Sequence, residues 1–170
     1  RPQMATIREN IFLKNTPIEN KEGLITTFSH DFKFNNDIKI LKKITKSIVR
    51  EDITKARIIV SGGRGVSKDI LLLEQTAQSL NGEIAASRAL VDEGICSKTI
   101  QVGQTGKTVR PIIYIACGIS GAVQHTAGMD NSEMIIAINK DEKAPIFDIA
   151  DIGIVGDAKL ILNEINVQLR

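Results

Sequence analysis

The chain has 170 residues, of which 42% are hydrophobic and 25% charged, with a formal net charge of +2. This length suits one domain with a sizeable core plus an appendage, and the composition is typical of a globular protein. The net charge argues neither for nor against a polyanionic partner, but no run of Lys and Arg is dense enough to suggest nucleic acid, and aromatic residues (4%) are scarce for base stacking. No apolar run reaches the roughly 18 residues of a membrane span. The two cysteines form neither a metal-binding spacing nor a disulfide framework, so we expect a reducing compartment.

The first 52 residues carry an irregular pattern. Apolar residues within 6–13 and 24–34 predict two strands, and residues 38–49 place apolar side chains on one helical face. The chain begins Arg1-Pro2, without an initiator Met or a signal-peptide pattern, which suggests a fragment or a processed product. We therefore expect residues 1–52 to be the remnant of a preceding α/β domain with its linker. Residues 55–170 are expected to form a second domain.

From residue 56 the pattern becomes regular, with short apolar runs alternating with segments of helical period. The runs predict strands over residues 58–60, 83–86, 112–117, 134–138, 145–147 and 152–155. Helices are predicted after Ser67, after Arg88, over residues 120–127 with Gly128 behind them, and after Asp157. This alternation predicts an α/β fold: a doubly wound, mostly parallel sheet with helices on both faces.

Residues 100–125 carry the strongest functional signal. A polar loop with two glycines precedes a buried strand, and a second glycine turn then opens a helix. Backbone N–H groups at such a helix start have no internal partner and suit a phosphate. In doubly wound sheets, ligands bind at the carboxyl ends of the strands. Several polar or glycine residues fall at that edge: Gly63, Arg64, Ser87, Arg88, Ser120, Asn139 and Asp157.

Common nucleotide motifs do not identify the ligand. The pair Gly63-x-Gly65 lacks the third glycine of the dinucleotide fingerprint, because Lys68 occupies that place. Gly106-Lys107 lacks the spacing of a phosphate-binding loop of nucleoside triphosphatases. Neither a nicotinamide nor a triphosphate site is supported by its own motif.

A longer series of motifs is more specific. It comprises SGGRG, ASRALVDEG, QVGQTGK, YIACGISGAVQHTAGM, AINKDEKAPIF and ADIGIVGD, in this order over residues 56 to about 157. The series closely resembles the carboxyl-terminal domain of the electron transfer flavoprotein alpha subunit. RPQMAT at residues 1–6 is similar to the end of that subunit's first domain.

The resemblance implies a Rossmann-like domain that binds FAD. It places Arg88 over the isoalloxazine ring, Thr105 near flavin N5 and His125 near the flavin O2. A cation and a hydrogen-bond donor there stabilise the negative charge of a reduced flavin and raise its potential. The implied cofactor-binding residues are Arg64, Ser87, Arg88, Val102, Gly103, Gln104, Thr105, Ser120, Gly121, Ala122, Val123, Gln124, His125, Asn139, Asp157 and Ala158.

Within this set, residues 120–125 are implied to hold the pyrophosphate, and Asn139 and Asp157 the adenosine part. Ala158 stands where the family commonly has leucine, so the contact there either runs through the backbone or is lost. We expect no metal ion and no catalytic triad, because the flavin carries the redox chemistry.

The implied function is electron transport by a carrier protein, not by an enzyme. The implied partners are the electron transfer flavoprotein beta subunit in a heterodimer, and acyl-CoA or other flavin dehydrogenases. The implied location is the bacterial cytoplasm, or the mitochondrial matrix in a eukaryote. Two alternatives are a module that binds an adenine nucleotide without redox turnover, and an NAD-dependent enzyme on a similar fold.

Overall fold

The computed structural model describes residues 3–7, 11–12, 15–19, 21–30, 41–42 and 52–169. By its internal contacts the chain divides into two units, residues 13–49 and the remainder. All the described residues before Asp52 are exposed, and none of them lies in a helix or strand. For the described parts of residues 6–13 and 24–34 the predicted strands are therefore wrong. Leu24 and Phe28, for example, are 93% and 86% exposed.

The rest of these two segments, and most of the predicted helix at 38–49, lies outside the described residues. The assignment of residues 1–52 to a preceding domain stays a prediction.

Within residues 52–169 the chain forms one parallel sheet of five strands, in the order β2-β1-β3-β4-β5. Every neighbouring pair of strands is parallel, which confirms the predicted α/β class. The strands are β1 (Ile58–Gly62), β2 (Glu83–Ala86), β3 (Ile113–Cys117), β4 (Met134–Asn139) and β5 (Ile152–Val155).

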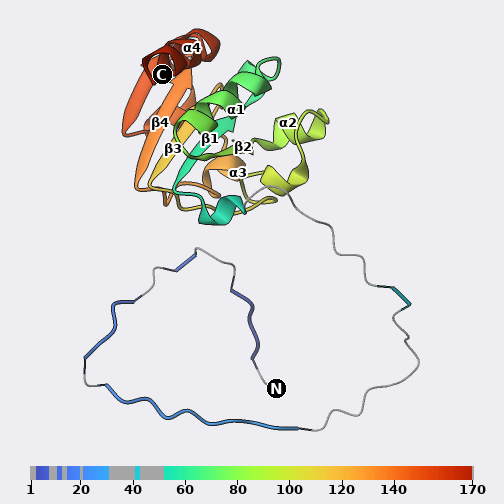
Figure 1. Ribbon diagram of the computed structural model, residues 1–170, viewed down its shortest axis with the longest axis vertical. Helices are drawn as coiled ribbons and strands as arrows, with labels where there is room; N and C mark the ends of the chain where they lie inside the picture. Colours follow the sequence, from blue (N-terminus) through green and yellow to red (C-terminus); the bar gives the residue numbers. More distant parts are fainter. Residues whose placement is uncertain are drawn as a thin grey trace. The chain divides into compact units, whose positions relative to one another are not determined.

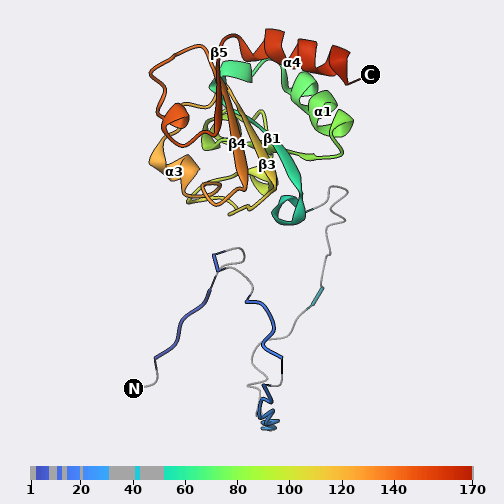
Figure 2. The same cartoon turned by 90° about the vertical axis from the view of Figure 1, so that its left-hand side faces the viewer.

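Two longer helices, α1 (Ile70–Ser79) and α4 (Ala158–Gln168), pack against each other. A buried hydrogen bond of 3.0 Å from Asn166 Nδ2 to Thr76 Oγ1 joins them. Figures 1 and 2 show both helices on one face of the sheet, with the short helix α3 (Val123–Thr126) on the other face. Because both faces are covered, β1 and β3 are buried almost throughout, as the apolar runs over residues 58–60 and 113–117 predict.

Several predicted boundaries are corrected. Residues 145–147, predicted as a strand, belong to the 3-10 helix η4 (Pro145–Asp148), because β5 takes the place beside β4 and Pro145 fixes a helical first position. Ser67 ends the 3-10 helix η2 (Arg64–Val66), whereas α1 begins after Asp69. The remaining short elements are η1 (Ile53–Lys55), η3 (Lys98–Ile100) and α2 (Arg88–Asp92).

The helix predicted over residues 120–127 is shorter than expected. Gly121 has a φ of +88°, outside the helical region, and the carbonyl of Ser120 accepts a hydrogen bond of 3.0 Å from the backbone N–H of Ile146. These contacts divert the chain, so α3 begins only at Val123 and ends at the cap residue Ala127. A tertiary contact with η4 therefore overrides the local helical pattern.

The packing of Gly121 predicts a measurable cost of substitution. A Cβ atom at Gly121 would lie 2.2 Å from the backbone nitrogen of Ile146. We expect Gly121→Ala to lower the free energy of unfolding by about 2 kcal/mol or more, through a backbone clash added to left-handed strain. Denaturant unfolding measures this value.

Gly94→Ala is the matched control, because Gly94 has a φ of +72° but no neighbouring atom within 4 Å of the position that a Cβ would take. This variant therefore has the left-handed backbone strain of Gly121→Ala but no clash of the added Cβ atom with a neighbour. Equal losses of stability in the two variants would contradict the close packing of Gly121 on η4.

Candidate functional site

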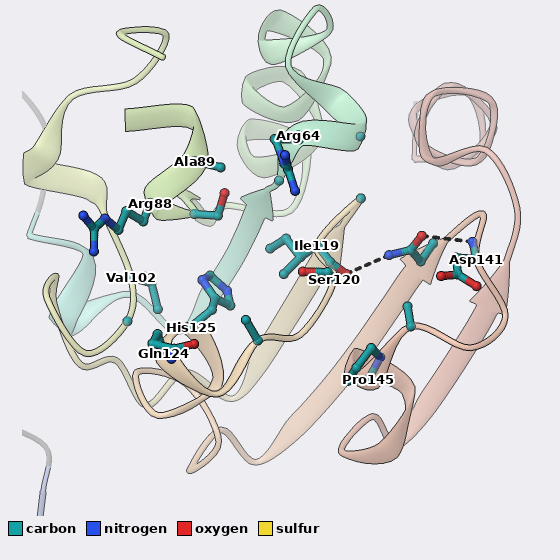
Figure 3. A pocket seen from close by; sticks show the side chains of 18 of the residues that line it. Arg64, Arg88, Ala89, Val102, Ile119, Ser120, Gln124, His125, Asp141 and Pro145 are labelled. Carbon is teal, nitrogen blue, oxygen red and sulfur yellow. Dashed lines mark hydrogen bonds between the residues drawn. The ribbon is translucent and has the colours of Figure 1, made fainter. Parts of the chain in front are cut away.

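A cavity of about 680 Å³ lies across the carboxyl edge of the sheet (Figure 3). This volume is in the range of small-molecule and cofactor sites, roughly 300–1,000 Å³. The register of the ladders aligns the strand ends, with Gly62 beside both Ala86 and Cys117, and Asn139 beside Val155. Residues that follow each of the five strands line the cavity: Gly63, Arg64, Ser87, Arg88, Gly118, Ser120, Asn139, Lys140, Gly156 and Ala158.

The cavity opens where the strand order reverses. The chain leaves β1 for β2 on one side, and β3 lies on the other side of β1. Two turns meet at this point, since the N–H of Gly63 donates to the carbonyl of Cys117 (2.9 Å) and that of Gly65 to the carbonyl of Gly118 (3.2 Å). This is the topological switch point at which open α/β sheets bind ligands.

The loop predicted from the VGQT motif forms one wall of the cavity. Val102 donates its N–H to the carbonyl of Ala86 at the end of β2 (3.0 Å), and Gln104 donates its N–H to the carbonyl of Gln124 (2.7 Å). The buried Gln101 side chain donates from Nε2 to Thr105 Oγ1 at 2.9 Å. These bonds hold the loop between β2 and α3 and bring Thr105 to the cavity.

Three cationic side chains line the cavity. Arg88 forms an exposed ion pair with Asp92 one helical turn away (3.1 Å), and Lys140 pairs with Asp157 (2.9 Å). Within residues 52–169, Arg64 has no ion-pair partner. Figure 3 shows Arg64 and His125 directed toward the same space, while Arg88 extends away from them. The unpaired charge of Arg64 favours an anionic group in the cavity.

Two polar atoms in the cavity wall are buried without a hydrogen-bond partner, namely Ser87 Oγ and His125 Nδ1. Buried polar atoms are almost always paired, so both fit a site that a polar ligand completes. The other ring nitrogen of His125, Nε2, lies 3.1 Å from the hydroxyl oxygen of Tyr114. Burial lowers the pKa of His125 to about 4, and the nearby backbone of Val102 opposes this shift only in part. His125 is therefore a neutral imidazole at pH 7.

The structure brings the sequence-predicted site residues together at this cavity, with three exceptions. Gly121 packs against η4, and Val123 is 75% exposed outside the cavity lining. The carboxylate of Asp157 caps α4 through the N–H of Lys159 (2.9 Å) and pairs with Lys140. In addition, α3 has only four residues, so the helix dipole expected to favour a phosphate there is small.

Sequence reasoning missed part of the lining. The sequence gives no reason to expect Lys140 anywhere but in solvent, and Ala144 and Pro145 fall in or beside the segment wrongly predicted as a strand. The other residues of this group lie within the quoted motifs, one or two positions from predicted residues, so the motifs themselves were the available signal, and Gly63 was already expected at this edge of the sheet. The lining residues outside the predicted set are Gly63, Gly65, Ala89, Gln101, Gly118, Ile119, Lys140, Asp141, Ala144, Pro145 and Gly156.

The buried imidazole predicts a pH dependence of stability. An unfolded histidine has a pKa near 6.5, whereas that of His125 is about 4 in the fold. As the pH falls, the unfolded state takes up this proton first, so the free energy of unfolding should decrease from about pH 6.5 to pH 4. The expected contribution is on the order of 3 kcal/mol.

Denaturant unfolding of the wild type and of His125→Gln across this pH range isolates the contribution, because all other titrating groups are shared. Parallel stability curves for the two proteins would contradict the buried, neutral state of His125.

Comparison with known proteins agrees with this site. Residues 52–130 match the family model of the electron transfer flavoprotein FAD-binding domain, which confirms FAD as the predicted cofactor. In the described part of the chain no helix is long and apolar enough to cross a membrane.

Three similar proteins illustrate the relationship. "Protein FixB" from Clostridium saccharobutylicum is 51% identical over 100% of this chain and 52% of its own length. The electron transfer flavoprotein subunit alpha from Clostridium acetobutylicum is 45% identical, with the same coverage of 100% and 52%. The acryloyl-CoA reductase electron transfer subunit beta from Anaerotignum propionicum is 48% identical over 92% of this chain and 45% of its own length.

The chain thus spans about half the length of these relatives. The resemblance drawn from the motif series is confirmed over the whole chain by these alignments and over residues 52–130 by the family model. The whole chain is thus similar to about half of an electron transfer flavoprotein alpha subunit, and residues 52–130 match the FAD-binding domain of that family.

Proposed function

We propose that this chain binds FAD across the carboxyl edge of its sheet and serves as the redox-active part of an electron transfer flavoprotein. The observation that carries the proposal is a continuous cavity that reaches the ends of all five strands. A site of this extent suits a dinucleotide, whose two halves lie on either side of the switch point.

The residues of the cavity fit FAD chemically. The glycine turns after β1 and β3 allow backbone to approach a pyrophosphate closely, and the unpaired Arg64 supplies positive charge beside them. Ser87 Oγ and His125 Nδ1 are polar atoms that need a partner. Lys140 and Asp141 form a polar end of the cavity near β4 and β5, which suits the hydroxyl groups of a ribose.

When bound, FAD supplies the one- and two-electron chemistry, and the chain supplies binding, orientation and electrostatics. The buried wall formed by Val102 and His125 keeps water from that part of the site. Arg88, on the exposed side, brings a cation to the β2 end of the cavity. Its exposure to solvent is what a carrier requires, because electrons must pass between proteins.

The remaining assignments follow from the resemblance to the electron transfer flavoprotein alpha subunit. The chain acts as a carrier rather than as an enzyme, pairs with a beta subunit in a heterodimer and exchanges electrons with acyl-CoA or other flavin dehydrogenases. Relatives come from bacteria and, in the case of the Dictyostelium discoideum protein, carry the description mitochondrial. We accordingly place the chain in the bacterial cytoplasm, or in the mitochondrial matrix of a eukaryote.

Cofactor analysis tests the proposal. The purified protein should be yellow and release one FAD per chain. Ser120→Leu should lower this occupancy several-fold without changing the free energy of unfolding of the flavin-free protein, since Ser120 is exposed in the cavity wall and leucine fills space there. Absorbance and chromatography of the released cofactor measure the occupancy, and denaturant unfolding measures the stability.

Val123→Leu is the control, because it adds an apolar side chain to a neighbouring exposed residue outside the cavity lining. It should leave the occupancy unchanged. A colourless protein that binds AMP would favour the adenine-nucleotide module, and competition by NAD for the cavity would favour the nicotinamide enzyme.

The charge of Arg88 predicts a shift in redox potential. Arg88→Ala should lower the potential of the bound flavin by tens of millivolts, because a cation near a reduced flavin stabilises its negative charge. About 30 mV corresponds to 1.4 kcal/mol for a two-electron couple. Spectroscopic titration against a reference dye measures the shift.

Asp92→Asn removes the ion-pair partner of Arg88 and keeps the arginine. This variant should have a potential equal to or above that of the wild type. A potential unchanged in Arg88→Ala would remove Arg88 from the flavin environment.

A further inference from the structure

We propose that Tyr114 is a positioning residue that fixes the proton of His125 on Nδ1, so that this histidine presents a hydrogen-bond donor, and not an acceptor, to the cavity. The proposal about the cavity ligand rests on the function proposed above. It adds a residue of β3 that lies behind the site and does not line the cavity.

The pair is enclosed in the core. Tyr114 is fully buried (0% exposed) and His125 is 8% exposed, and their polar atoms Oη and Nε2 lie 3.1 Å apart. The two rings meet edge to face, with centroids 6.2 Å apart and planes at 60°. This arrangement joins the middle of β3 to the helix α3 that borders the cavity.

The direction of the hydrogen bond follows from proton availability. Burial raises the pKa of the Tyr114 hydroxyl, so the phenol keeps its proton near neutral pH. The nearby Ser61 side chain opposes this rise in pKa, but its Oγ atom is buried without a hydrogen-bond partner. The hydroxyl proton of Tyr114 needs an acceptor, and Nε2 of His125 lies at hydrogen-bond distance.

The protonation state of the His125 imidazole determines which ring nitrogen donates a hydrogen bond. A neutral imidazole has one N–H and one acceptor nitrogen. Burial keeps His125 neutral at pH 7. If Nε2 accepts from Tyr114, the ring proton resides on Nδ1, which is the buried nitrogen without a partner in the cavity wall. A partner for an N–H donor is a carbonyl oxygen or an anionic oxygen, both of which an oxidised or reduced isoalloxazine ring carries.

The first test needs no cofactor. Long-range ¹H–¹⁵N correlation spectra of the histidine-labelled 170-residue chain distinguish the two tautomers. The chain has two histidines, so the His30→Ala variant leaves the signals of His125 alone. We expect the Nδ1–H tautomer in the flavin-free and the FAD-bound protein. A dominant Nε2–H tautomer in the wild type would overturn the proposal, even if the protein binds FAD.

The second test removes the hydroxyl. Tyr114→Phe should turn the single tautomer of His125 into a mixture and lower the flavin potential. Ile115→Val is the matched control: it trims a buried side chain of the same strand, and it should leave both readouts unchanged. If both variants changed the tautomer of His125 and the flavin potential alike, the effect would come from a general loosening of β3. That result would overturn the positioning role of Tyr114.

A double-mutant cycle shows whether Tyr114 acts through His125. In a His125→Asn background, adding Tyr114→Phe should cause no further change in potential. An additive change would overturn the proposal. Absence of FAD from the wild type would contradict the proposed function. The tautomer spectra would still show whether Tyr114 fixes the proton of His125 on Nδ1.

Discussion

The parallel register of the five strands is the constraint on which the site depends. Because neighbouring strands run in the same direction and end at the same level, the segments that follow them meet at one edge. The strand order reverses at β1, because β2 lies on one side of it and β3 on the other. The turns that follow β1 and β3 therefore lead away in different directions and leave a space between them. Residues more than 90 positions apart in the chain, such as Arg64 and Ala158, therefore line one cavity.

Two kinds of contact shape that space. Backbone hydrogen bonds join one strand end to the next, as between Ser87 and Gly62 (2.9 Å) and between Gly118 and Ile138 (2.8 Å). These bonds leave few backbone groups free to move, so the turns are held before any ligand arrives. The side chains divide differently, since Ser87 Oγ and His125 Nδ1 are buried in the wall, whereas Arg88 and Lys140 form ion pairs exposed to solvent. This division suits a flavin whose ring is tuned by protein groups while one side stays open for electron exchange.

The elements that could be predicted are those whose sequence pattern reflects burial. β3 and β4 are unbroken apolar runs because both faces of the sheet are covered, and the turns that follow them carry the family motifs. The start of α3 and the form of η4 could not be predicted, because both depend on the contact of Gly121 and Ser120 with Ile146, which lies 25 positions beyond Gly121. The apolar residues near Leu24 have a strand-like pattern, but the described ones are exposed and lie in no strand, so the pattern alone does not predict a sheet there.

The same limit applies to the site. Motif order identifies most of the lining, since each motif follows a strand. It does not show that the carboxylate of Asp157 is engaged by Lys140, nor that Tyr114, which the pattern places only in a buried strand, contacts His125. Such side-chain contacts depend on the tertiary fold and produce no periodic pattern in the sequence.

The central claim is that the carboxyl edge of this sheet holds a flavin dinucleotide. The most direct measurement is a crystal structure of the chain grown with FAD. We expect density for the whole dinucleotide between the turns after β1 and β3, with the isoalloxazine ring against the Val102–Thr105 loop and the adenosine toward β4 and β5. Density for FAD at another surface, or a cavity closed by side chains in the presence of saturating FAD, would contradict it.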